Sequence, residues 1–385
     1  MNPSAVGSVA IPVPRLDPVT RVTLQTVADR VGVSRMTVSN AFSRPDQLST
    51  ALREKVLAAA AELGYVGPDP AARALARGTA GAIGVLMTDS LAYAFTDEVA
   101  TGFLGAVADG LAPTGLAMTL LTSGVRDGHV PARDVPMDGA LVYSCGFDSS
   151  AVDWLTRRGL PMVFVDQVPV PGIPSVNVDD RGGARAAAQH LIDLGHRRIG
   201  IVNSEHADHT ESAALVAATP SGELHVSHQR MLGWTDALAA AGLEPVLTRE
   251  AVRPAEWAAG EVERPEDVDA RAVRDMLERP DRPTAVLCFS DAVAFGALQV
   301  AAELGIGVPG ELSVVGFDDN PLAAQVRPGL TTVRQDVAAK GRAAAAALTA
   351  AIERARTGAT APAGGHVLLP TELVIRESSG PVRPG

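Results

Sequence analysis

The stretch Val22-Thr-Leu-Gln-Thr-Val-Ala-Asp-Arg-Val-Gly-Val-Ser-Arg-Met-Thr-Val-Ser-Asn40 predicts two short helices joined by a tight turn. Thr23 and Ser34 are residue types that cap helix starts, and Gly32 suits the turn between the helices. Ala28 lies where the second helix must come close, so its small side chain fits. This spacing is typical of a helix-turn-helix, although spacing alone also fits another small helical bundle.

The residues around this stretch extend it to a small helical head. A third helix is expected from Ser49 or Thr50 to Leu63, with Gly64 ending it. The prolines and small residues of residues 1–20 predict a disordered leader before the head. We therefore expect a DNA-binding domain over residues 21–66.

The charge of the chain is unevenly distributed. The 385 residues carry a formal net charge of -11, but residues 1–78 hold nine Arg and Lys against six Asp and Glu. That segment carries +3, and the remainder carries -11 - 3 = -14. A basic end on an acidic body favours a nucleic-acid partner for the head alone. No membrane span and no signal peptide are evident, which predicts a cytoplasmic protein.

From residue 80 onward, short apolar runs alternate with helical stretches, which predicts parallel sheets with helices on both faces. Ligands of such sheets bind beyond the carboxyl ends of the strands. Residues 203–228 and 248–270 are expected to be irregular, and residues 122–138 are expected to lack a helix. Cys145 and Cys288 lie in apolar runs and are interpreted as buried core residues rather than a disulfide. The expected strands cover Ala82–Met87, Ala140–Tyr143, Met162–Val165, Ile199–Val202, Ala285–Phe289 and Leu312–Val315.

The head stretch and the run Leu52–Tyr65 closely resemble the lactose-repressor (LacI/GalR) family of transcription regulators. The resemblance covers roughly residues 21–380. It implies an all-α helix-turn-helix head, a hinge helix or linker over 67–79, and an α/β bilobal sensor domain over 80–380. That sensor is expected to be periplasmic-binding-protein-like, with two parallel-sheet lobes. Further matching runs are Asp179–Ala184, His190–Gly200, Arg230–Trp234, Phe289–Leu298, Val315–Asn320 and Leu330–Asp336.

The resemblance implies that the second helix enters the major groove of operator DNA by its N-terminal end. Arg35, Met36 and Asn40 match positions that contact base edges. Arg35 fits a bidentate contact to guanine or a phosphate contact, Asn40 fits adenine, and Met36 offers an apolar contact such as a thymine methyl. Hydroxyl groups that suit either phosphate contacts or helix caps are those of Thr23, Ser34, Thr37 and Ser39.

The hinge begins at Asp69-Pro70, which suits a helix N-cap and first position. A helix this short is marginal alone in water. In the family such helices pair in the minor groove, which implies that Leu75 wedges into a base step, with Arg73 as a further DNA contact. A plain linker is the alternative, and the spacing from Tyr65 to Leu75 is one residue longer than usual.

In the sensor, the resemblance implies effector contacts from Asp166, Arg230 and Asp291. Tyr93 and Phe95 are expected to form an aromatic wall of the effector site. Carboxylates, a guanidinium and aromatic rings suit a sugar or nucleoside-like effector, although each residue also fits a structural cap or a surface position. A homodimer, alone or paired into a tetramer, would bind double-stranded operator DNA. Whether the effector strengthens or weakens operator binding stays open. No cofactor is expected.

The sequence also allows two rival functions to be stated. A metal-dependent enzyme is suggested by the spacing of His206/His209 and His225/His228, but no metal site is predicted. The chain lacks a nucleophile elbow or phosphate loop, so we expect no catalytic residues. A transport binding protein is disfavoured by the helix-turn-helix and the absent signal peptide.

Overall fold

The computed structural model describes residues 22–69, 72, 74, 78–87, 91–122, 128–144, 150–202, 225–247, 265–359 and 365–382. Of Pro45, Ala92, Tyr93 and residues 265–269 it describes the backbone alone. The described residues fall into two compact units, one before Gly81 and one from Gly81 onward. The expected leader, residues 1–20, lies outside the described residues.

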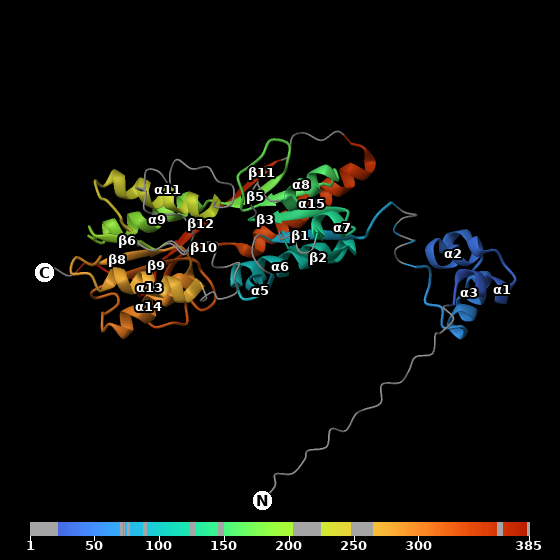
Figure 1. Cartoon of the computed structure of the whole chain (residues 1–385), viewed down its shortest axis with the longest axis horizontal. Helices are drawn as coiled ribbons and strands as arrows, with labels where there is room; N and C mark the ends of the chain where they lie inside the picture. Colours follow the sequence, from blue (N-terminus) through green and yellow to red (C-terminus); the bar gives the residue numbers. More distant parts are fainter. Residues whose placement is uncertain are drawn as a thin grey trace, which may run out of the picture. The chain divides into compact units, whose positions relative to one another are not determined.

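The first unit is a three-helix head built from α1 (Leu24–Val31), α2 (Arg35–Ser43) and α3 (Thr50–Glu62), with a short 3-10 turn at Pro45–Gln47 (Figure 1). Thr23, Ser34 and Ser49 cap the three helix starts, so the predicted helices are confirmed and Ser49 is the cap of α3. Gly32 ends α1 with φ 79°, a left-handed conformation that glycine adopts readily.

A small apolar core holds the head together. Ala28 and Val38 are fully buried, as the spacing predicts, and Phe42 packs edge-on against Tyr65 with ring centroids 5.6 Å apart. The side chain at residue 28 must be small because α1 and α2 cross there. The remaining buried core residues are Val27, Val31, Ala41, Val56, Ala59 and Ala60.

The first lobe of the sensor is a parallel sheet of strand order β11-β5-β4-β3-β1-β2. The helices of this lobe include α5 (Leu91–Ala94), α6 (Glu98–Leu111), α7 (Pro131–Asp134), α8 (Ser150–Arg157) and α15 (Val337–Thr357), of which α6 and α15 pack together. The strands are β1 (Ala82–Met87), β2 (Ala117–Thr122), β3 (Gly139–Tyr143), β4 (Met162–Val165), β5 (Ser175–Val178) and β11 (His366–Leu369).

The second lobe is a sheet of strand order β12-β10-β9-β8-β6-β7, parallel except for β12, which runs antiparallel to β10. The helices include α9 (Asp180–Asp193), α11 (His225–Ala240), α13 (Pro265–Leu277) and α14 (Asp291–Glu303). The strands are β6 (Ile199–Val202), β7 (Val246–Leu247), β8 (Ala285–Cys288), β9 (Ser313–Asp318), β10 (Thr331–Gln335) and β12 (Thr371–Val374).

Glycines let the helices approach closely in both lobes. A Cβ at Gly341 of α15 would lie 2.6 Å from the Cβ of Ala106 on α6, and a Cβ at Gly233 of α11 would meet the carbonyl of Arg181 on α9. Neither position tolerates a larger residue without a backbone shift. These glycines therefore set the spacing of one helix pair in each lobe.

The chain passes between the lobes at three places, between β5 and α9, between β10 and α15, and between β11 and β12. The first and third crossings are bonded together: the Asp179 N–H donates to the Leu369 carbonyl (2.8 Å), and the Thr371 hydroxyl donates to the Asp179 carbonyl (3.0 Å). The lobes are thus joined by neighbouring backbone segments rather than by one linker.

The structure corrects two sequence-based expectations. The stretches expected to be irregular contain helix, because His225–His228 open α11 and Pro265–Leu277 form α13. Residues 122–138, expected to lack a helix, contain the one-turn helix α7. Cys288 is a buried thiol in β8, as predicted, and Cys145 lies outside the described residues.

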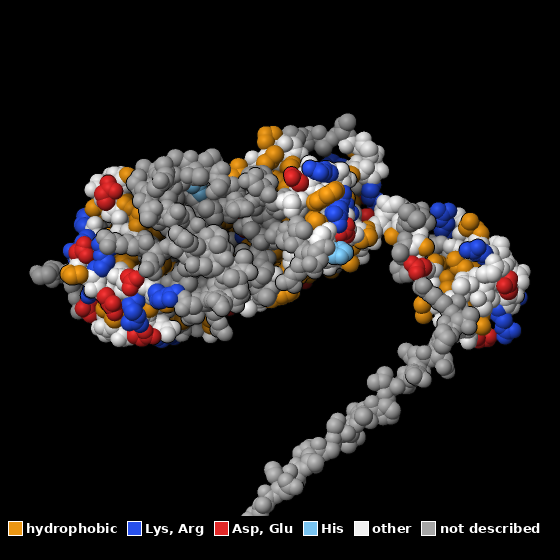
Figure 2. All heavy atoms as spheres, viewed as in Figure 1, with side chains coloured by type: hydrophobic (Ala, Val, Ile, Leu, Met, Phe, Trp, Pro, Cys, Tyr) orange, Lys and Arg blue, Asp and Glu red, His pale blue; other side chains and the backbone are white. Residues whose placement is uncertain are grey.

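Acidic and basic side chains lie side by side on the end of the sensor that carries α13 and α14 (Figure 2), where Arg274 pairs with Glu303 and Glu278. Such mixed charge gives a nucleic-acid backbone little net attraction at this end. Among the described helices, none has the length and apolar character needed to cross a membrane.

Candidate functional site

The head presents the start of α2 to solvent. Ser34 caps this helix by accepting the Thr37 N–H at 3.1 Å, which fixes the first turn. Arg35 and Met36 follow the cap and are exposed, with Met36 at 69%. An exposed guanidinium and thioether at a helix N-terminus are free to reach a groove of DNA.

The other predicted head residues lie around this turn and mostly hold local bonds. The Thr37 hydroxyl lies 2.9 Å from that of Ser34, and Thr23 exchanges capping bonds with Thr26. The Asn40 amide donates to Gln47 (3.1 Å), so it is positioned on the helix before any partner binds. Ser39 is half-buried on the same helix. Arg73 and Leu75, the predicted hinge contacts, lie outside the described residues.

In the sensor, strained backbone gathers at the carboxyl ends of strands. Among the described residues, the non-glycine positions with positive φ are Ser144 after β3 (51°), Asp166 after β4 (55°), Asp318 at the end of β9 (112°) and Asp319 (55°). Such conformations cost free energy and persist where the surrounding structure requires them, often at binding sites. They mark the strand edge at which α/β sheets bind ligands.

A buried chain of polar bonds crosses the lobe boundary at this edge. The Lys340 ammonium, on α15, pairs with the Asp166 carboxylate at 2.5 Å and donates to the Gln335 amide oxygen at 3.0 Å. Gln335 ends β10 and donates to Asp318 at 2.7 Å. The chain thus ties the end of β4 in one lobe to the ends of β9 and β10 in the other.

Arg230, on α11, extends this network through the second lobe. Its guanidinium donates to Asp180 (2.9 Å), Asp318 (3.3 Å) and the Phe289 carbonyl, and packs against the rings of Phe289 and Phe317. Burial raises the pKa of Asp180 and of Asp318 to about 6 each, against the opposing effect of Arg230. The arginine therefore stabilises two desolvated carboxylates.

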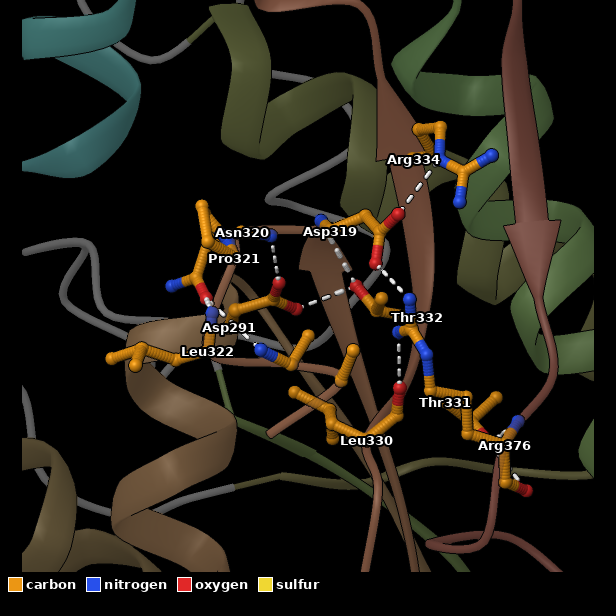
Figure 3. A network of polar contacts seen from close by, with 12 residues as sticks. Asp291, Asp319, Asn320, Pro321, Leu322, Leu330, Thr331, Thr332, Arg334 and Arg376 are labelled. Carbon is orange, nitrogen blue, oxygen red and sulfur yellow. Dashed lines mark hydrogen bonds and ion pairs between the residues drawn. The ribbon is translucent and has the colours of Figure 1, made fainter. Parts of the chain in front are cut away.

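Asp291 begins α14 and fastens the loop after β9 (Figure 3). Its carboxyl group accepts the Thr332 hydroxyl at 2.5 Å and the Asn320 N–H at 2.7 Å. Burial, with repulsion from Asp318, raises the pKa of Asp291 to about 8, although these two hydrogen bonds lower it. Neighbouring Asp319 is held separately, by Arg334 at 2.7 Å and Arg376 at 2.6 Å, as Figure 3 also shows.

The structure brings some of the predicted effector residues together. Asp166 and Arg230 belong to one network, and Asp291 interacts electrostatically with Asp318 of that network. Phe95 directly follows α5 and is 61% exposed, whereas for Tyr93 the backbone alone is described.

Sequence reasoning missed Lys340, Gln335, Asp180 and Asp318. One available signal was the single lysine in the alanine-rich run after Asp336, because a lone charge on an apolar helix face needs a partner. It also missed Tyr143, at the end of β3, whose ring stacks on Phe103 with centroids 4.6 Å apart.

The histidines considered for metal binding divide between described and undescribed segments. His225 and His228 lie on the first turn of α11, and the His225 Nε2 atom is 3.3 Å from the Asn177 amide nitrogen. His206 and His209 lie outside the described residues. Among the described part of the chain, no group of three or more His, Cys, Asp or Glu has the arrangement of a metal site.

The fold and these sites define a class of protein, a helix-turn-helix regulator that carries a two-lobed sensor. Residues 23–67 match the model of the bacterial regulatory proteins of the lacI family, and residues 188–379 match a periplasmic binding protein-like domain. An HTH-type transcriptional regulator of Mycolicibacterium smegmatis is 38% identical over 341 residues, which span 84% of this chain and 89% of that protein.

Two solved structures agree in fold over nearly the whole chain. The lac repressor dimer bound to operator and the anti-inducer ONPF has a TM-score of 0.69 at 26% identity, covering 93% of this chain and 99% of that one. The complex of the transcriptional regulator CelR with cellobiose has a TM-score of 0.60 at 28% identity, covering 93% and 100%. The chain belongs to the LacI family and is a DNA-binding transcriptional regulator.

Proposed function

We propose that this regulator is a repressor that binds a pseudo-palindromic operator as a homodimer. Residues 21–66 form the DNA-binding domain, 67–79 the hinge and 80–380 the sensor and dimerisation domain. Arg35, Met36 and Asn40 read base edges, and Leu75 enters the minor groove beside Arg73. The hydroxyls that contact phosphates while capping or flanking the helices are those of Thr23, Ser34, Thr37 and Ser39.

The observation that carries the proposal is the start of α2. A capped helix N-terminus with exposed Arg35 and Met36 side chains is what major-groove recognition requires. The likeness to the lac repressor dimer in its operator complex supports the dimeric form. In such a dimer each protomer reads one half-site, so the operator mirrors the two-fold symmetry of the protein.

The sensor is proposed to bind a sugar or nucleoside-like effector at the lobe boundary, with contacts from Asp166, Arg230 and Asp291 and an aromatic wall from Tyr93 and Phe95. Support comes from the polar chain at the strand ends and from the cellobiose bound by CelR. The effector acts by favouring one arrangement of the lobes, which changes operator affinity in either direction. The protein works by binding rather than catalysis, in the cytoplasm where its DNA lies.

Fluorescence anisotropy on the DNA upstream of its own coding region tests this proposal. The full chain is titrated against that DNA and a scrambled duplex, across salt, with and without sugars and nucleosides. Specific binding with a steep salt slope, altered by one ligand, is the expected result. Arg35→Ala serves as the control for specificity. Absence of binding to any pool of random duplexes, with ligands present, would refute the repressor function.

A further inference from the structure

An asparagine of the first lobe has its amide orientation fixed by the backbone. Asn177, on β5, is 3% exposed. Its Oδ1 atom accepts the Gln167 N–H at 3.2 Å, and its Nδ2 atom donates to the Gln167 carbonyl at 2.7 Å. The reversed amide would bring donor against donor and acceptor against acceptor, so this orientation is the one that satisfies both bonds. One hydrogen on Nδ2 is left for another acceptor.

That acceptor is a histidine of the second lobe. His225 begins α11, which packs on α9, and its Nε2 atom lies 3.3 Å from Asn177 Nδ2. Since Asn177 Nδ2 can only donate, Nε2 must accept, and an imidazole nitrogen accepts only when it carries no proton. The bond therefore requires a neutral His225 whose proton is on Nδ1.

This bond joins the lobes through a helix that is distant in sequence from the chain crossings. Lys340 and Gln335, which also bond at the boundary, are five positions apart around the second crossing, so the chain itself keeps them close. His225 is 48 positions from Asn177 and is held there by the packing of α11. A rotation of one lobe against the other would therefore change the distance between Asn177 and His225.

Titratable groups from three elements act on His225. Burial lowers its pKa, and His228 on α11 and His366 on β11 lower it further, whereas Asp166 after β4 raises it. The pKa lies below its ordinary value, so the ring is neutral at pH 7 and can accept the bond. Protonation at lower pH places an N–H on both ring nitrogens, and the imidazolium then repels the Asn177 amide and is attracted by Asp166.

We propose that the bond between Asn177 and His225 is a pH-sensitive latch between the lobes. While the imidazole is neutral, the latch holds the lobe arrangement described above. Protonation releases it, so acidification shifts the lobe equilibrium and with it the affinity for operator. This inference rests on the proposed function, since it assumes that the lobe arrangement sets operator affinity. It gives the regulator a second input, the proton, besides its effector.

The test compares the full-length wild type with His225→Gln and His228→Gln. Glutamine can accept the Asn177 hydrogen through its side-chain oxygen but does not titrate, so it keeps the bond at every pH. His228→Gln is the matched control, because it removes a titrating ring from the first turn of the same helix. Each protein is studied from about pH 5 to about pH 7.5, by urea unfolding without DNA and by anisotropy on the DNA upstream of its coding region at fixed salt.

We expect the wild type to lose stability relative to His225→Gln as pH falls below about 6.5, because the unfolded chain then binds a proton that the latch excludes. Over the same range the operator Kd of the wild type should change about threefold to tenfold more than that of His225→Gln. Asp180 and Asp318, each with a pKa of about 6, titrate in all three proteins and cancel in the comparison. His228→Gln should keep both responses of the wild type.

Equal pH dependence of stability or of operator Kd in the wild type and His225→Gln overturns the latch and leaves effector control intact. Loss of the response in His228→Gln as well overturns its assignment to His225. Specific operator binding that is absent at every pH overturns the proposed function and with it the regulatory role of the latch, and the unfolding data distinguish that failure from failure of the bond itself.

Discussion

Replacing Lys340 with Met removes the cation that holds Asp166 and leaves a carboxylate in a desolvated position. The two side chains are 1% and 6% exposed and their charged atoms lie 2.5 Å apart, so solvent screens the pair little. Removing one partner of such a buried ion pair lowers the free energy of unfolding by about 3–5 kcal/mol. For a chain of this size, with an unfolding entropy of about 0.8 kcal/mol/K, that corresponds to a fall of roughly 4–6 °C in Tm.

A double-mutant cycle separates the pair from its surroundings. Asn is the matched replacement for Asp166, because it is nearly isosteric and tolerates the left-handed φ of 55° found there. Urea unfolding followed by circular dichroism is measured for Lys340→Met, Asp166→Asn and the double variant. The loss in free energy of unfolding of the double variant should be much smaller than the sum of the losses of the two single variants. The coupling free energy between the two substitutions should be at least about 2 kcal/mol. Additive losses, or a Lys340→Met loss below about 1 kcal/mol, would refute the buried pair.

Three further predictions concern other parts of the chain. Arg35→Ala should weaken specific operator binding by about 1–3 kcal/mol and relax base preference at one position, measured by anisotropy on operator variants. Asp291 has its pKa raised to about 8, so the folded chain holds a proton that the unfolded chain loses near pH 4. Its contribution to stability therefore falls as pH rises from about 4 to 8. We measure the free energy of unfolding of Asp291→Asn and of the wild type by urea unfolding at pH 5 to 8. The variant should become more stable relative to the wild type by up to about 1.4 kcal/mol per pH unit. A difference that does not change with pH would contradict the shifted pKa. Gly233→Ala should destabilise by about 1–3 kcal/mol because its Cβ meets α9, whereas Gly296→Ala, with open space on α14, should stabilise by up to about 1 kcal/mol in the same assay.

The head and several of the buried strands could be predicted from the sequence because local signals decide them. Thr23 and Ser34 are helix caps whose side chains act within one turn, and Gly32 adopts the turn conformation on its own. Short strands such as β1 and β4 are buried on both faces of a parallel sheet, so they read as unbroken apolar runs. Edge strands β11 and β12 give a weaker signal, because each has only four residues, β11 is largely exposed, and β12 begins with the polar pair Thr371 and Glu372.

The polar network at the lobe boundary, our candidate effector site, was only partly predictable, because its contacts join residues far apart in the chain. Lys340 meets a partner 174 positions away, and Arg230 meets Asp318 88 positions away. The family resemblance singled out Asp166, Arg230 and Asp291, whose effector contacts stay predictions, whereas their bonding partners required the tertiary structure.

The central claim is that operator and effector bind to separate sites whose affinities are coupled. The most direct test measures the operator Kd with and without saturating ligand, and the ligand Kd with and without saturating operator, on the same full-length protein. Coupling between two binding equilibria must be reciprocal, so both ratios should equal one factor of roughly 5–150. Ratios of one in both experiments, with each ligand binding specifically, would contradict effector control of this regulator.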